Sequence, residues 1–147
     1  MCIVFGGFVL ARVLAVKDAT GDVEQGFRRM ESTGLEYYSG DDGLNFAWLA
    51  HGASGVISVV AHADAHSWRE MVQEVDEGDL AGARAVAQRM RPVTRAIMGG
   101  GQGAVMAKEA LLLQGRIPSA ELRLPLVRAV EDEVAELRRV LDAAGLL

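Results

Sequence analysis

Cysteine is nearly absent from the sequence, which has Cys2 and no other cysteine in 147 residues. A single thiol cannot form an internal disulfide or build a cysteine-based zinc site, and such a composition is typical of a reducing cytoplasm. Long hydrophobic runs are missing too, since no stretch reaches the roughly 18 consecutive apolar residues that a membrane-spanning helix requires. We therefore expect a cytoplasmic location and no membrane partner.

Positive charge is scarce and dispersed. The chain has 15 lysines and arginines against 20 aspartates and glutamates, a formal net charge of −5, and its arginines form no basic run with interleaved aromatic residues. A surface that neutralises nucleic-acid phosphates needs such a cluster, so we expect no nucleic-acid partner. Lysine itself is rare: Lys17 and Lys108 stand beside 13 arginines, which makes the position of each lysine informative.

Apolar residues make up half of the sequence, which indicates a globular chain. The apolar segment 1–10 lacks the basic start and the cleavage site of an export signal. Beyond it, three short apolar runs are each followed by a helical pattern, which predicts a parallel sheet with helical crossovers. The fold class is therefore α/β, with strands buried on both faces. The predicted strands cover 13–16, 35–39 and 55–61, and the predicted helices cover 23–34, 44–50 and 64–77.

From residue 79 onward the pattern is helical. An apolar stripe runs from Leu80 to Met98, and Pro92 is expected to bend or break that helix because proline removes a backbone donor. The glycine-rich stretch 99–103 is expected to be a connector. The remaining predictions are helices over 104–113 and 131–144 and an extended segment over 123–127.

Lys17 follows the first predicted strand, at the edge where catalytic groups of parallel α/β folds gather. Desolvation of an ammonium group there favours the free amine, which attacks carbonyl carbons to form imines. The alternative is structural: the stem of Lys17 packs on the strand edge and its head group pairs with Asp18 or Asp22. Position alone leaves both interpretations open.

His62 and His66 have the i, i+4 spacing of paired metal ligands. However, the glutamate of the zincin pattern is missing between them and no third ligand is evident. We therefore expect no metal site, and a position at a helix N-terminus or on the surface for both histidines.

Five motifs occur in an order that resembles the C-terminal half of the dihydrodipicolinate synthase family. The resemblance runs from about Arg12 to the end of the chain. It is specific because a lysine motif, a Gly-Asp-Asp turn and a glycine-flanked strand agree at once. The motifs are VKDATGD at 16–22, YSGDD at 38–42, GASGVISV at 52–59, LRLPL at 122–126 and AAGLL at 143–147.

The resemblance implies a class I, Schiff-base aldolase. It implies the last three βα units of a (β/α)8 TIM barrel over 12–78, followed by a C-terminal helical domain over 79–147, with 1–11 unmatched. Lys17 would be the catalytic lysine that condenses with pyruvate, and the enamine would attack aspartate semialdehyde on the way to lysine and diaminopimelate. Ile57 would bring its backbone beside pyruvate, and Gly40 would line the same pocket. No metal or organic cofactor is implied, because the protonated imine is the electron sink.

A complete barrel of this kind has about 250 residues, and only three of its strands can be placed here. The family's catalytic tyrosine, its threonine pair and its arginine lie before the lysine, so none is assigned, and Tyr37 and Tyr38 are expected to pack in the core or across strands. We expect a truncated lyase that is inactive alone. The alternatives are a catalytically silent half-barrel that acts as an assembly module, and an aldolase with another aldehyde acceptor. An unclosed sheet also predicts a homo-oligomer.

Overall fold

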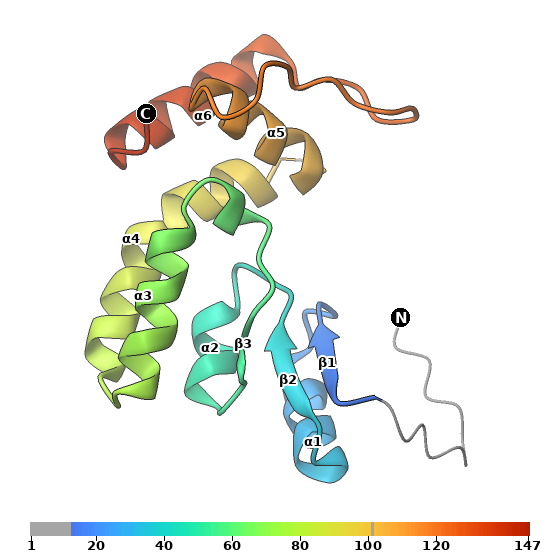
Figure 1. Ribbon diagram of the computed structural model, residues 1–147, viewed down its shortest axis with the longest axis vertical. Coiled ribbons are helices and arrows are strands. Elements are labelled where there is room, and N and C mark those ends of the chain that lie inside the picture. The colour runs from blue at the N-terminus through green and yellow to red at the C-terminus, as the bar shows by residue number, and fades with distance from the viewer. Residues whose placement is uncertain (1–12, 101) are drawn as a thin grey trace. The chain divides into compact units, whose positions relative to one another are not determined.

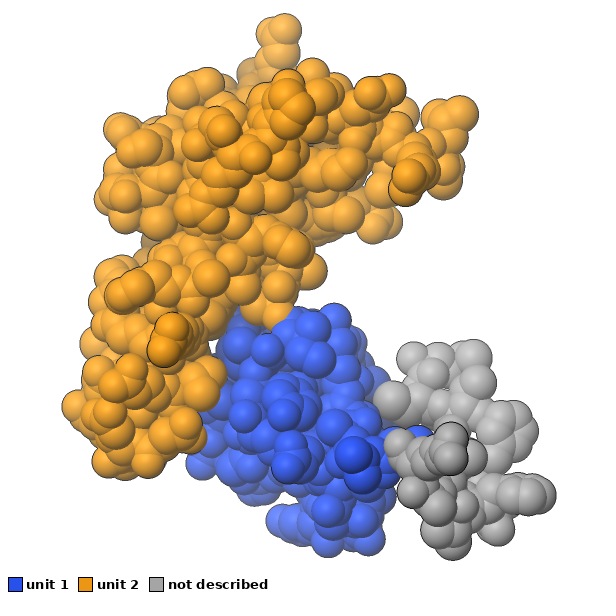
Figure 2. Space-filling model, viewed as in Figure 1, with its two compact units in different colours: residues 1–57 blue, residues 58–147 orange. Residues whose placement is uncertain are grey.

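The computed structural model describes residues 13–100 and 102–147. The chain forms two compact units, 1–57 and 58–147, which are coloured separately in Figure 2. Each unit is considered by itself. The predicted segments 1–11, 12–78 and 79–147 follow from the resemblance to a longer fold, and these boundaries remain a prediction.

Strands and helices alternate in the first unit, as the sequence predicts. The strands β1 (Ala15–Asp18), β2 (Glu36–Ser39) and β3 (Gly55–Val56) form a parallel sheet in the order β1-β2-β3 (Figure 1). The helices α1 (Val23–Thr33) and α2 (Asn45–Ala50) connect them. This arrangement confirms the α/β class.

Local signals set the ends of α1. The side chain of Asp22 accepts a hydrogen bond from the Gln25 amide at 3.0 Å, which satisfies one of the free donors at the helix start. Gly34 ends the helix with φ 63°, a left-handed conformation that glycine adopts without strain. The predicted helix over 23–34 is confirmed.

Aromatic side chains hold this unit together beneath the sheet. Tyr37 and Trp48 are buried with rings stacked at 6.2 Å between centroids, and Phe27 meets Trp48 edge-on at 5.3 Å. Gly26 leaves room for the indole, since a β-carbon at that position would overlap Trp48 Cη2. Tyr37 therefore packs in the core, as predicted.

Two strand predictions need correction. The first strand begins at Ala15 rather than Val13 and extends through Lys17 to Asp18. It is not buried on both faces, because Ala15 and Lys17 are exposed and Leu14, just before it, is 79% exposed. Burial on both faces requires elements packed on both faces, and among the described residues β1 packs mainly on β2, its neighbour in the sheet.

The third predicted strand, 55–61, is too long. β3 ends at Val56, and Val60–His62 form a short 3-10 helix, η1. Val60 is fully buried there. An apolar run predicts burial, but its periodicity does not distinguish a strand from a buried turn of helix.

The second unit contains η1 and four α-helices, and their apolar faces form its core. Asp64 caps the start of α3 by accepting a hydrogen bond from the Ser67 amide at 3.1 Å. The largest apolar side chains buried there include Met71, Ile97, Leu137 and Leu141. The helices are α3 (Ala65–Asp76), α4 (Leu80–Met98), α5 (Gly103–Leu113) and α6 (Glu131–Ala143).

The two prolines expected to shape this unit have different outcomes. α4 continues through Pro92, so the helix is not broken there and the expected bend stays a prediction, while Met90 and Val93 near the proline are buried. The segment 123–127 is not extended but contains a turn, in which the Leu126 amide donates to the Arg123 carbonyl at 3.1 Å. Proline suits a turn as well as an extended segment. Within the described ranges, no helix has the length and apolar character needed to cross a membrane.

Candidate active site

The three predicted site residues lie along the carboxyl edge of the sheet in the first unit. Lys17 is the third residue of β1, Gly40 follows β2 directly, and Ile57 follows β3 directly. Backbone hydrogen bonds fix this arrangement: the Gly40 amide donates to the Asp18 carbonyl at 2.7 Å, and the Ile57 amide donates to the Ser39 carbonyl at 2.8 Å. Consecutive parallel strands thus bring together three residues that span forty positions of sequence.

Lys17 and Gly40 are in direct proximity. A β-carbon at position 40 would lie 2.5 Å from Lys17 Cε and 2.9 Å from Lys17 Cγ. Such distances are shorter than van der Waals contact, so the stem of Lys17 occupies the space that the missing side chain leaves. A residue larger than glycine at position 40 would displace the stem of Lys17.

The side chain of Lys17 is exposed, in contrast to the predicted desolvation. Among the described elements β1 packs mainly on β2, and a strand partner covers an edge of β1 rather than the face that carries Lys17. The structural alternative also fails in its specific form. Asp18 contacts Thr20 and Arg29, and Asp22 caps α1, so neither carboxylate pairs with the lysine among the described residues.

Ile57 is 48% exposed although it is an isoleucine. Its amide is used by the hydrogen bond to Ser39, which fixes its backbone beside the end of β2. The side chain of Ile57 is thus not part of the core.

Tyr38 is the register partner of Lys17, so the two residues share a face of the sheet. Its ring lies over Gly55, where a β-carbon would be 3.1 Å from Tyr38 Cε1. Its hydroxyl donates to Glu36 Oε2 at 3.2 Å. This hydrogen bond and the negative charge of Glu36 raise the pKa of Tyr38 above its usual value near 10. The expected cross-strand packing of Tyr38 is thus present.

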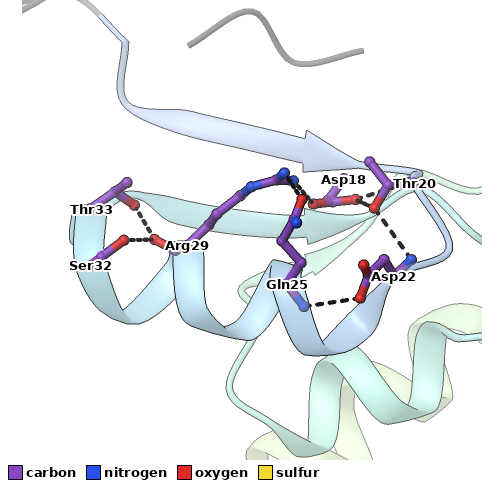
Figure 3. A network of polar contacts seen from close by, with 7 residues as sticks. All are labelled: Asp18, Thr20, Asp22, Gln25, Arg29, Ser32 and Thr33. Carbon is purple, nitrogen blue, oxygen red and sulfur yellow. Dashed lines mark hydrogen bonds and ion pairs between the residues drawn. The ribbon is translucent and has the colours of Figure 1, made fainter. Parts of the chain in front are cut away.

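A polar network below Lys17 was not predicted from the sequence. Asp18, adjacent to the lysine, is 1% exposed and contacts Thr20 and Arg29. Arg29 also donates a hydrogen bond to the side chain of Gln25 (Figure 3). The motif DAT at 18–20 signals a local side-chain to backbone turn, because aspartate readily bonds a backbone amide two residues on. The contact between Arg29 and Asp18 has no such sequence signal, since it depends on which face of α1 packs against β1.

The histidines show no sign of joint metal binding. The carbonyl of His62 accepts a hydrogen bond from Arg116 at 3.2 Å, and His66 Nδ1 lies 4.0 Å from a carboxylate oxygen of Glu70. Over residues 13–100 and 102–147, no group of three or more histidine, cysteine, aspartate or glutamate side chains is arranged to hold a metal ion.

Comparison with known proteins identifies the family. The model of the dihydrodipicolinate synthetase family matches residues 8–144. The chain belongs to this family. Curated proteins named 4-hydroxy-tetrahydrodipicolinate synthase support the assignment. The relative from Bifidobacterium longum is 44% identical over 138 residues, which cover 94% of this chain and 46% of the relative. The relative from Kineococcus radiotolerans is 46% identical over 135 residues, which cover 92% of this chain and 44% of the relative.

Solved structures of dihydrodipicolinate synthases share the fold of this chain over about half of their own length. The Thermotoga maritima enzyme superimposes with a TM-score of 0.89 at 35% identity, over 95% of this chain and 48% of that one. A chloride-inhibited Acinetobacter baumannii enzyme complexed with pyruvate gives 0.83 at 28% identity, over 89% and 45%. This chain therefore spans about half the length of the family members that it matches.

Proposed function

We propose that this chain is the imine-forming part of a 4-hydroxy-tetrahydrodipicolinate synthase. Residues 12–78 would be the last three βα units of a (β/α)8 barrel, and residues 79–147 would be its helical domain. The substrates would be pyruvate and aspartate semialdehyde. The family and the parallel βα units support this proposal.

One observation carries the proposal at the level of chemistry: the stem of Lys17 rests on Gly40 at the carboxyl edge of parallel strands. Catalytic groups of barrels and open α/β sheets stand at this edge. Lys17 has no hydrogen bond or ion pair with another described residue, which leaves its amine available to a carbonyl compound.

In the proposed reaction, the Lys17 nitrogen attacks the ketone carbon of pyruvate, and the ketone oxygen leaves as water. The positively charged imine withdraws electrons, so a base can remove a proton from the pyruvate methyl group. The resulting enamine carbon forms a bond with the aldehyde carbon of aspartate semialdehyde, while the π bond of the aldehyde breaks and its oxygen takes up a proton. Water then hydrolyses the imine and frees the Lys17 amine. Gly40 and the backbone of Ile57 would line the pyruvate pocket, and the imine itself supplies the electron sink without a metal or organic cofactor.

The base for this proton transfer is not assigned. Tyr37 is buried in the core, and the hydroxyl of Tyr38 is bonded to Glu36. General acid–base groups and well-placed binding groups supply a large share of enzymatic rate enhancement. We therefore propose that the 147-residue chain forms the imine but does not condense pyruvate with aspartate semialdehyde at a measurable rate.

A second candidate is an assembly module without catalysis, or a piece of an aldolase for another aldehyde. The observation behind the module is the exposed edge: Val13 is 41% and Leu14 is 79% exposed beside a strand with one partner. Such edges favour association with other chains.

Borohydride reduction separates the imine-forming function from the assembly module. With pyruvate present, an imine at Lys17 would be reduced to a stable secondary amine that increases the mass of the protein. Lys17→Arg should abolish the increase, because a guanidinium remains protonated and forms no imine. A chain that gains no mass with pyruvate would exclude the imine-forming function and leave the assembly module. Robust turnover by the isolated chain would overturn the proposed inactivity.

A further inference from the structure

Asp18 directly follows Lys17 and points to the opposite face of β1, because side chains alternate along a strand. Its side chain is 1% exposed, whereas Lys17 is exposed. A carboxylate buried to this extent is stable only when it is hydrogen-bonded or paired with a positive charge. The contacts of Asp18 therefore affect how firmly the end of β1, which carries Lys17, is held.

Both carboxylate oxygens of Asp18 have a neighbour (Figure 3). Oδ1 accepts hydrogen bonds from the Thr20 amide at 2.9 Å and from the Thr20 hydroxyl at 2.7 Å. Oδ2 lies 3.7 Å from Nη1 of Arg29 on α1, and Arg29 donates from Nη2 to the side chain of Gln25. The loop after β1 and the helix α1 thus hold the strand end from the side opposite Lys17.

The strand end needs such an anchor. β1 has four residues and, within the described part of the chain, pairs with β2 only. Short edge segments open more readily than central ones. The hydrogen bond from the Gly40 amide to the Asp18 carbonyl joins this end to the glycine on which Lys17 rests. Opening at Asp18 would move Lys17 away from Gly40.

We propose that Asp18, with Thr20 and Arg29, forms a positioning network that fixes the direction from which the Lys17 amine meets a carbonyl substrate. The inference rests on the proposed function, since imine formation is the step that requires a fixed amine. The three residues act through the backbone of β1 and need not touch substrate. A reacting atom displaced by about 1 Å can lower a rate by roughly a hundredfold. The loss of one contact in the network should displace the amine by less and lower the rate by a smaller factor.

The experiment measures the rate at which pyruvate is trapped on Lys17 of the full chain by cyanoborohydride, over a series of pyruvate concentrations. Thr20→Val removes the hydroxyl and preserves the shape of the side chain, and Thr20→Ser restores the hydroxyl. Arg29→Gln removes the ion pair with Asp18. Arg28→Gln is its matched control, because Arg28 is the preceding residue of the same helix and pairs with Glu24 at the exposed surface.

We expect Thr20→Val and Arg29→Gln each to lower the saturating trapping rate about threefold to tenfold, because each removes one contact of a network that acts on Lys17 only through the backbone of β1. The pyruvate concentration for half the saturating rate should remain unchanged, because Gly40 and Ile57 follow β2 and β3 rather than β1. Thr20→Ser and Arg28→Gln should trap at the unsubstituted rate. Unchanged rates in both Thr20→Val and Arg29→Gln would overturn the inference, as would an equal loss in Arg28→Gln.

A second readout does not depend on pyruvate. If the unsubstituted chain forms no adduct at Lys17, the proposed function fails, and hydrogen exchange of the Gly40 amide tests the network alone. We expect this amide to exchange at least about threefold faster in Thr20→Val and Arg29→Gln than in Thr20→Ser and Arg28→Gln. Equal exchange in all four variants would contradict any anchoring of β1 by Asp18.

Discussion

The aliphatic stem of Lys17 lies against the bare α-carbon of Gly40, so close that a β-carbon at position 40 would be 2.5 Å from Lys17 Cε. The two residues belong to neighbouring parallel strands, and the Gly40 amide is bonded to the carbonyl of Asp18. This proximity links the sequence motif around the lysine to the motif of the next strand, and it gives the first prediction.

Gly40→Ala should displace the lysine stem and lower the rate of imine trapping at Lys17 by about tenfold to a hundredfold. The stability of the fold should change little, because a flexible lysine stem can move into solvent. Gly43→Ala is a suitable control, since its β-carbon would be 3.4 Å from Asp41 Oδ1 and would not touch the lysine. Trapping by Gly40→Ala at the Gly43→Ala rate would show that the contact has no effect on Lys17.

Gly26→Ala should destabilise the first unit by about 1–3 kcal/mol, because the new methyl group overlaps the buried indole of Trp48. This loss should exceed the gain of up to about 1 kcal/mol that alanine gives over glycine in a helix. Urea unfolding followed by far-ultraviolet circular dichroism measures the difference, because this signal does not depend on Trp48. In a Trp48→Phe background the clashing atoms are gone, so the same substitution should be neutral or stabilising. An equal cost in both backgrounds would rule out the steric explanation.

The ionisation of Tyr38 should depend on Glu36, whose hydrogen bond and charge raise the tyrosine pKa. The folded state then holds the phenolic proton more tightly than the unfolded state. The resulting stability is present below the usual tyrosine pKa near 10 and is lost as the pH rises through the higher folded value. In a Tyr37→Phe background, where Tyr38 is the remaining tyrosine, Glu36→Gln should lower the midpoint of an ultraviolet tyrosinate titration. A midpoint that does not fall would mean that the two side chains do not interact in solution.

Self-association should occur through the exposed edge of β1. Leu14→Lys places a charge beside this edge, and charges there oppose strand pairing between chains. Size-exclusion chromatography with light scattering should find an oligomer for the unsubstituted chain and a smaller species for Leu14→Lys. Leu124→Lys, a change at an 88% exposed leucine of the second unit, should leave the oligomer intact. A monodisperse unsubstituted monomer would contradict the expected homo-oligomer.

The sequence predicts helices well where their signals are local. Asp22 and Gly34 mark the ends of α1, and Asp64 marks the start of α3, because a capping side chain acts within one turn. Strand burial is different, since it depends on which strands lie alongside. Lys17 is exposed, and no residue near position 17 reveals what packs on its face of the sheet.

The candidate site is predictable to a similar extent. The sequence predicts Lys17 and Gly40 at the ends of neighbouring strands, and the parallel sheet brings those ends to one edge. The predicted third strand, 55–61, instead places Ile57 inside a strand, whereas β3 ends at Val56. The ion pair of Asp18 with Arg29 is not predictable from such motifs. It joins residues eleven positions apart on different elements, and its formation depends on how α1 rotates above the strand.

The location of the pyruvate adduct tests the central claim most directly. Lys17 and Lys108 are the two lysines of the chain, and Lys108 is bonded through Nζ to the Glu121 carbonyl at 2.6 Å, which makes it an internal control. After reduction with borohydride in the presence of pyruvate, peptide mass spectrometry should find the adduct on Lys17 and none on Lys108, and Lys17→Arg should remove it. An adduct on Lys108 with Lys17 unmodified would contradict the assignment of Lys17 as the imine-forming residue.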